Sequence, residues 1–192
     1  MITSTKQQLR KQYLARRLGL LADEYARLNG LLLAGFKGLD LRGVGCIHIY
    51  LPMLQRLEPD TRLMIDWLKG HHPHIKRVFP KTDLASLRMD AYADDGALEL
   101  EENSLGILEP VAGNLVDVGD IDMVIVPLLA FDKKGYRVGY GKGFYDRFMA
   151  QCKPGTRFVG LSFFEPVEAI ADIDGYDIPL HLCITPEKVW VF

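Results

Sequence analysis

Apolar residues recur at helical spacing near the start of the chain and again in two short segments further on. Residues 21–37 have leucine, tyrosine and phenylalanine three or four positions apart and stop near Gly38, which predicts an amphipathic helix. Before it, residues 4–18 are mainly helix formers that follow Ser4 or Thr5, and either residue is a good N-cap. Two shorter helices are predicted at 61–70 and 143–152.

Continuous apolar runs predict the strands. They occupy residues 46–52, 75–80, 123–131, 156–163 and 187–192. The run MVIVPLLAF at 123–131 is apolar throughout, which predicts one strand that is buried on both faces. The segment 83–115 alternates only weakly and contains glycine and proline stops, so it predicts two short strands and a loop.

The order of these elements predicts the fold. Strands alternate with helices, and no linker or internal repeat interrupts them, so we expect a single domain over residues 1–192. The expected class is α/β: a three-layer α/β/α domain with a mainly parallel central sheet and an N-terminal helical pair. Ligands of such sheets bind at the carboxyl ends of the strands, which places the loops 52–61 and 129–145 on one rim.

Composition narrows the class of protein. Hydrophobic residues make up 48%, enough for a large core, and the net charge of −2 argues against a nucleic-acid partner. Three cysteines without CxxC spacing indicate reduced thiols in a cytoplasmic protein. We expect no signal peptide, because the N-terminal segment lacks an apolar core, and no membrane span, because no apolar run reaches 18 residues. At this size a monomer is expected.

The segment GYRVGYGKGFYDRF at 135–148 has the chemistry of a phosphate-binding loop. It follows the apolar run 123–131 and opens a predicted helix. Glycines allow backbone N–H groups to approach an anion, and the helix start adds a partial positive charge. Arg137 and Lys142 add full charges. The spacing matches neither GxxxxGK[ST] nor GxGxxG, so a surface turn with solvated basic residues stays open.

Four other positions are candidates for binding. Asp146 follows the loop and suits Mg²⁺ beside phosphates, or simply favours a helix start. Lys6 and Arg10 share one helix face, which suits either an anionic ligand or plain solvation. Glu58 is either a rim acceptor for a polar heterocycle or part of a helix cap. The histidines of 71–74 lie in a predicted turn, where we expect no metal.

Taken together, these segments resemble the 5-formyltetrahydrofolate cyclo-ligase family, also called methenyltetrahydrofolate synthetases. VPLLAFDKKGYRVGYGKGFYDRF at 126–148 follows the family pattern P-x-x-x-F-D, a spacer, then R-x-G-x-G-x-G-[YF]-Y-D. The family's K-x-x-L-R and E-x-[DE]-T appear as Lys6, Leu9 and Arg10 and as Glu58, Asp60 and Thr61. Segments 106–110 and 177–185 are also similar, so the resemblance covers nearly the whole chain.

The resemblance implies an enzyme that uses ATP and Mg²⁺ to convert 5-formyltetrahydrofolate into 5,10-methenyltetrahydrofolate, with ADP and phosphate as products. It implies that Asp146 holds Mg²⁺, with Asp174 as a candidate second acid. Phosphoryl transfer needs charge neutralisation, and we expect Arg137 or Lys142 to stabilise the transferred group as the catalytic residue. The implied ATP-binding residues are Lys6, Arg10, Arg137, Val138, Gly139, Tyr140, Gly141, Lys142, Gly143, Phe144 and Tyr145. The implied folate-binding residues are Tyr50, Leu51, Met53, Glu58, Phe144 and Tyr145.

Two departures from the family and two alternatives remain. The loop between Tyr50 and Glu58 is longer than in many relatives, and His181 stands where many have an acid. One alternative is an unrelated ATP-binding α/β enzyme. The other is a paralogue that binds folate or nucleotide without turnover, which the joint presence of the motif cations and Asp146 disfavours.

Overall fold

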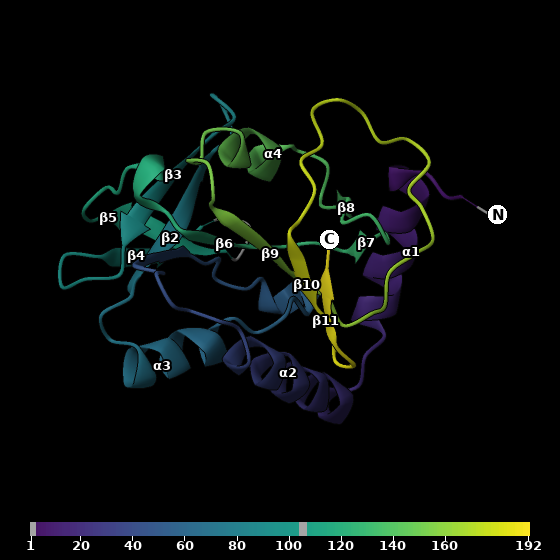
Figure 1. Ribbon diagram of the computed structural model, residues 1–192, viewed down its shortest axis with the longest axis horizontal. Helices are drawn as coiled ribbons and strands as arrows, with labels where there is room; N and C mark the ends of the chain where they lie inside the picture. The colour runs from purple at the N-terminus through teal and green to yellow at the C-terminus, as the bar shows by residue number, and fades with distance from the viewer. Residues whose placement is uncertain (1–2, 104–106) are drawn as a thin grey trace.

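The computed structural model describes residues 3–103 and 107–192, and within these ranges its centre is a seven-stranded sheet (Figure 1). The strand order is β11-β10-β9-β6-β1-β2-β3. The strands are β1 (Cys46–His48), β2 (Lys76–Asp83), β3 (Arg88–Ala93), β6 (Met123–Val126), β9 (Arg157–Leu161), β10 (Leu182–Ile184) and β11 (Val189–Val191). Neighbours from β10 to β2 are parallel, and β3 and β11 join antiparallel at the two edges. The mainly parallel sheet is therefore confirmed.

Helices cover both faces of the sheet and complete the three layers. In Figure 1, α2 (Ala22–Lys37) and α3 (Arg62–His71) lie below the sheet and α4 (Phe144–Met149) lies above it. The lower core joins Phe36 and Leu68 to Ile47 of β1, and the upper core joins Phe148 to Val124 of β6. Alternate residues of each strand point to opposite faces, so continuously apolar strands supply both cores.

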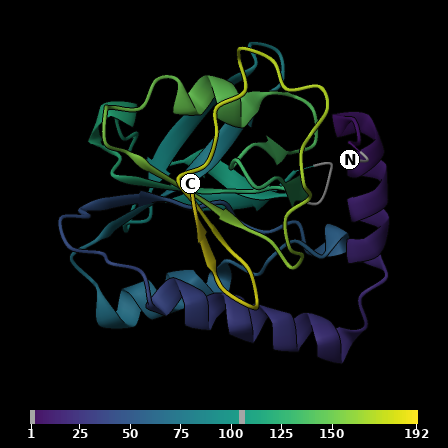
Figure 2. The same cartoon turned by 45° about the vertical axis from the view of Figure 1, so that its right-hand side comes forward.

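The first helix, α1 (Lys6–Leu18), has its own surface. Thr5 caps it in a capping box with Gln8. Its buried residues Leu9 and Tyr13 pack on a small hairpin around residues 130–138, described below, instead of on α2. Figure 2 shows α1 upright beside the sheet while α2 runs beneath the sheet. The two N-terminal helices are present as predicted, and they cover different parts of the molecule.

The predicted strand 123–131 is wrong, because the chain leaves the central sheet at Pro127. Proline cannot donate a hydrogen bond to the ladder, so β6 ends at Val126. The next residues form β7 (Ala130–Phe131), which pairs with β8 (Arg137–Val138) in a separate two-stranded sheet. This break carries the following loop over the carboxyl end of the central sheet, beside α1.

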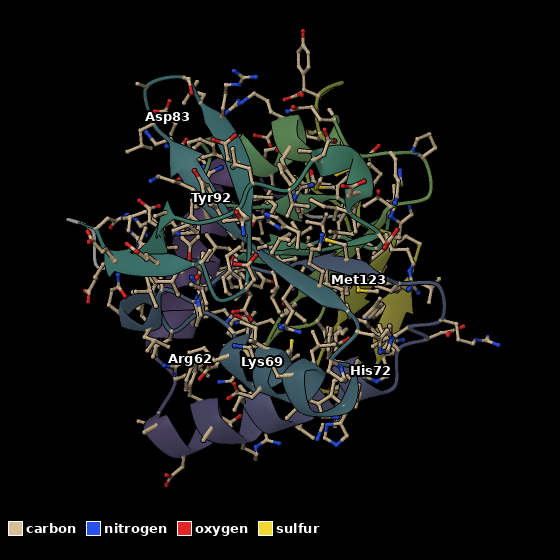
Figure 3. All side chains as sticks on the ribbon, turned by 90° about the vertical axis from the view of Figure 1, so that its left-hand side faces the viewer. Arg62, Lys69, His72, Asp83, Tyr92 and Met123 are labelled. Atoms are coloured by element: carbon tan, nitrogen blue, oxygen red, sulfur yellow. The ribbon has the colours of Figure 1, made fainter. Side chains whose placement is uncertain are left out.

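The segment 83–115 also differs from the prediction, since its described residues, 83–103 and 107–115, include three strands. β3 forms an edge hairpin with β2, while β4 (Glu99–Glu102) and β5 (Leu108–Ala112) form a second hairpin. β2 continues past Pro80 because β1 pairs with it only as far as Val78. In the side-chain view of Figure 3, Asp83 lies at the far end of the β2–β3 hairpin, away from Arg62 and Lys69 of α3.

Two further features concern the chain as described. Its three cysteines are free thiols. Among the described residues, no helix is both long and apolar enough to span a bilayer.

Candidate active site

One cavity of about 1290 Å³ opens at the carboxyl ends of β1, β2 and β6. The predicted rim loops 52–61 and 129–145 both contribute to its wall. The β2–β3 hairpin, the β4–β5 hairpin and one face of α1 complete it. Small-molecule pockets usually enclose about 300–1,000 Å³, so this cavity has room for two substrates side by side. The residues predicted from the sequence all line it: Lys6, Arg10, Tyr50, Leu51, Met53, Glu58, Arg137, Val138, Gly139, Tyr140, Gly141, Lys142, Gly143, Phe144, Tyr145 and Asp146.

The glycine loop connects β8 to α4 and lies against an arginine from α1. The Nε atom of Arg10 donates to the carbonyl of Gly139 at 2.9 Å. Gly141 has φ of +90°, and a Cβ atom there would lie 3.0 Å from the Arg10 guanidinium. The missing side chain at Gly141 therefore provides the room in which Arg10 packs against the backbone, a reason for glycine that the sequence did not suggest.

A second arginine, Arg147 of α4, holds the other side of the same loop. Its guanidinium donates to the carbonyl of Lys142 at 2.7 Å and to the carbonyl of Leu87, at the tip of the β2–β3 hairpin, at 3.0 Å. It also lies over the ring of Phe144. Sequence reasoning missed Arg147, although its position four residues after Gly143 placed it one helical turn above the loop.

Arg137 and Asp146 form a buried ion pair at the floor of the cavity. Arg137 is only 8% exposed, and its guanidinium lies 2.8 Å from the Asp146 carboxylate. It also donates to the carbonyl of Ile178, whose own N–H donates to the same Asp146 oxygen. Burial lowers the pKa of Arg137, and the charge of Asp146 opposes that effect. The structure thus brings together two residues that the resemblance had placed on phosphate and on metal.

A segment near the C-terminus brings acids to Lys6. The ammonium group of Lys6 pairs with Asp177 and lies 3.4 Å from Asp174. Burial lowers the pKa of Lys6, but the hydrogen bonds and charges of Asp177 and Asp174 together outweigh burial, and the net shift is upward. Asp177 also acts on Arg137 through its charge. Sequence reasoning missed Asp177, because only the fold brings residues 6 and 177 together.

Glu58 forms the opposite end of the cavity. It is 2% exposed, accepts from the Tyr140 hydroxyl at 2.7 Å and accepts from the backbone N–H of Met53 at 2.8 Å. Burial raises the pKa of Glu58. The resemblance assigned Tyr140 to ATP, but the structure directs its hydroxyl to Glu58. The buried hydroxyls of Tyr50 and Tyr145 have no hydrogen-bond partner in the part of the chain that is described.

The two ends of the cavity suit different chemical groups. Lys142 is exposed and makes no ion pair with any described residue, so together with the loop N–H groups it suits phosphate. Glu58 suits the N–H groups of a heterocycle. No cluster of three or more metal-ligating side chains occurs within residues 3–103 and 107–192. Asp146 has a second oxygen that none of the described residues bonds, which fits Mg²⁺ held by one or two carboxylates and by phosphate oxygens.

The sequence matches the 5-formyltetrahydrofolate cyclo-ligase family over residues 2–177. A 5-formyltetrahydrofolate cyclo-ligase from Escherichia coli strain K12 is 31% identical over 138 residues, which cover 69% of this chain and 74% of that protein. The one from Mus musculus is 28% identical over 191 residues, which cover 92% of this chain and 91% of that protein.

Solved structures agree with the sequence match. The NMR structure of 5,10-methenyltetrahydrofolate synthetase from Aquifex aeolicus aligns with a TM-score of 0.80 and 30% identity, over 97% of this chain and 92% of that chain. The synthetase from Mycoplasma pneumoniae, at 24% identity and a TM-score of 0.73, shares the fold over 93% of this chain and 97% of that chain. The chain is therefore an enzyme that belongs to the 5-formyltetrahydrofolate cyclo-ligase family.

Proposed function

We propose that this enzyme converts 5-formyltetrahydrofolate into 5,10-methenyltetrahydrofolate with the consumption of ATP, in the presence of Mg²⁺, and with release of ADP and phosphate. The observation that supports this most directly is the large cavity at the carboxyl end of the sheet. It joins the glycine loop and its cations to the buried Glu58 and Tyr140, with room for a nucleotide and a folate together.

The proposed chemistry removes a poor leaving group. The formyl oxygen on N5 must depart when N10 attacks the formyl carbon. Transfer of the γ-phosphoryl group of ATP to that oxygen releases ADP and creates a phosphate ester. N10 then forms the new C–N bond and loses its proton, while the C–O bond breaks and phosphate leaves. Phosphoryl transfer depends mainly on positioning and on charge neutralisation, so no nucleophilic side chain is needed.

At the nucleotide end, the proposed ATP contacts are Lys6, Arg10 and the loop N–H groups. The ammonium group of Lys142 is exposed and has no ion-pair partner in the described ranges, so it is the cation that we assign to the transferred phosphoryl group. Arg137 is buried and pairs with Asp146. Its proposed role is to orient Asp146 and to add positive charge behind the loop. Asp146 would hold Mg²⁺, which neutralises phosphate charge when bound. Asp177 is less exposed than Asp174 and its charge acts on Arg137, so we propose Asp177 as the second acid.

At the folate end, Glu58 is the proposed acceptor for pterin N–H groups. Its carboxylate already accepts bonds from Tyr140 and Met53, which fix its orientation. The remaining proposed contacts are Tyr50, Leu51, Met53, Phe144 and Tyr145. The unpartnered hydroxyls of Tyr50 and Tyr145 support this assignment, because a buried hydroxyl is costly without a partner and a polar substrate would supply one.

The direct test is a spectroscopic assay of the purified protein. It is mixed with 5-formyltetrahydrofolate and Mg²⁺, and the near-ultraviolet absorbance of methenyltetrahydrofolate is followed after ATP is added. We expect a rise that requires both ATP and Mg²⁺ and that is lost in Lys142→Ala. A flat trace from a folded protein that binds ATP would contradict the proposal.

A further inference from the structure

Arg17, in the last turn of α1, is a buried cation outside every motif identified in the sequence. It is 3% exposed. Its Nε atom donates to the carbonyl of Arg56 at 2.9 Å, and its other nitrogens donate to the carbonyl of Leu128 and to the hydroxyl of Tyr140. One guanidinium thus joins the loop after β1, the turn after β6 and the glycine loop.

The bond to Tyr140 fixes the direction of a proton. Arginine can only donate hydrogen bonds, so the Tyr140 oxygen must act as acceptor toward Arg17. The single hydroxyl hydrogen is then directed to Glu58, 2.7 Å away. Arg17, Tyr140 and Glu58 therefore form a chain in which each donor has a defined acceptor, and the Glu58 carboxylate is held from beneath the cavity.

The bond to the Arg56 carbonyl anchors the loop that carries Glu58. This loop contains a 3₁₀ turn at Leu54–Arg56 and then Leu57 with φ of +48°, a left-handed conformation that is unfavourable for leucine. Arg17 anchors this loop at Arg56, the residue before the left-handed position, and so holds the segment that leads to Glu58.

We propose that Arg17 is a positioning residue for the folate end of the site, holding the 52–58 loop and Tyr140 so that Glu58 presents its carboxylate to the substrate. This inference rests on the proposed binding of the pterin by Glu58. It goes beyond that function because it names a residue that does not line the cavity and lies outside the motifs on which the resemblance rests.

The positive charge of Arg17 affects the pKa of Glu58, which a role in packing alone would not do. Burial raises the pKa of Glu58, whereas the positive charges of Arg17 and Arg56 lower it. The other titratable groups that face Glu58 are the phenols of Tyr25, Tyr50, Tyr140 and Tyr145. Phenols stay neutral in the acid range, so loss of Arg17 raises the pKa of Glu58 and protonates it at higher pH.

The test compares Arg17→Gln with Arg17→Lys and with the matched control Arg16→Gln. Arg16 is the neighbouring cation, is exposed and packs over Phe164 instead of facing the cavity. We expect Arg17→Gln to raise KM for 5-formyltetrahydrofolate about 10- to 100-fold, while KM for ATP stays close to wild type. We expect the acidic limb of kcat/KM to move to higher pH, Arg17→Lys to restore the limb in part, and Arg16→Gln to change neither.

A double-mutant cycle with Tyr140→Phe tests whether Arg17 acts on Glu58 through the Tyr140 hydroxyl. If Arg17 acts through Tyr140, part of the effect of Arg17→Gln disappears in the Tyr140→Phe background. Calorimetric titration with 5-formyltetrahydrofolate in the absence of ATP gives the same comparison without turnover. If the wild type binds 5-formyltetrahydrofolate but makes no product, the proposed function is wrong. The ratio of folate affinities between wild type and Arg17→Gln then still decides the role of Arg17.

Two results would overturn the inference. One is a folded Arg17→Gln with wild-type folate affinity and an unmoved acidic limb. The other is an equal loss of folate and ATP affinity, which would indicate general loosening of the site. If Arg17→Gln does not fold, Arg17→Lys and Tyr140→Phe give the same decision, because each breaks one link of the chain and retains the bulk of the side chain.

Discussion

At the scale of single residues, two glycines of the same loop differ in what surrounds them. Gly141 has φ of +90° and lies against the Arg10 guanidinium, whereas a Cβ atom at Gly139 would meet nothing within 4 Å. We expect Gly141→Ala to lower the free energy of unfolding by about 1–3 kcal/mol and to displace Arg10. Gly139→Ala should leave the urea midpoint unchanged and weaken ATP binding, because the proposed phosphate lies against that backbone. Equal effects of the two changes on stability would contradict this explanation.

Arg137 has both a structural and a proposed catalytic role. Replacement by Gln leaves Asp146 partly buried without its cation, and Asp146 is 27% exposed, so we expect a loss of about 1–3 kcal/mol in unfolding free energy. Turnover should fall at least about 100-fold, since the proposed positive charge behind the loop is lost and Asp146 is no longer oriented. Arg137→Lys keeps the positive charge beside Asp146 and is the matched control. Denaturant titration and the absorbance assay measure the two effects separately, and full activity in Arg137→Gln would show that its charge is not used.

At the scale of elements, Arg147 ties the tip of the β2–β3 hairpin to the glycine loop. Both of its acceptors are backbone carbonyls, those of Leu87 and Lys142. We expect Arg147→Ala to increase amide hydrogen exchange in the hairpin turn and in residues 139–143 together, by about tenfold or more per lost bond. Arg88→Ala, an exposed change at the start of β3, is the control. Faster exchange in only one of the two segments would show that Arg147 does not couple them.

The predictability of the elements follows from how locally each is determined. The helix starting at Lys6 has its capping box within four residues, so its position could be predicted from the sequence alone. The run 123–131 is apolar on both sides of the point where the strand ends, so its hydrophobic pattern does not mark that end. Only Pro127 indicates it. β4 has the sequence Glu-Leu-Glu-Glu, and glutamate is depleted in strands, so the local sequence disfavours a strand there. Pairing with β5 stabilises the strand.

At the scale of the whole molecule, the lining of the cavity was predicted where one short segment contains the lining residues. Contacts between distant segments were missed. The glycine loop and the Glu58 loop line the cavity as expected. The partners of these residues lie far away in sequence: Asp177 beside Lys6, Leu87 beside Arg147 and Arg17 beside Tyr140. Such pairs depend on the path of the chain between elements, and a single sequence does not contain that path.

The packing of His48 between the sheet and α4 makes the stability of the whole molecule depend on pH. Its ring is fully buried against Phe148 and Tyr145, and neither nitrogen has a hydrogen-bond partner among the described residues. Burial lowers the pKa of His48 from 6.5 to about 3. Between these two values the unfolded chain binds a proton that the folded chain refuses, so stability is lost as pH falls below 6.5.

From these values we expect His48 to destabilise the fold by about 2 kcal/mol at pH 5 relative to pH 8. His48→Phe removes the titrating group but keeps an aromatic ring against Phe148, so it should flatten this part of the pH dependence. Urea denaturation of wild type and variant between pH 8 and pH 5 measures the difference, with the exposed His74→Gln as control. Parallel curves for His48→Phe and wild type would mean that the folded protein accommodates the charged ring, either by opening a path to water or by moving α4 away from the sheet. In that case the upper core beneath the glycine loop would be more adaptable than its close packing indicates.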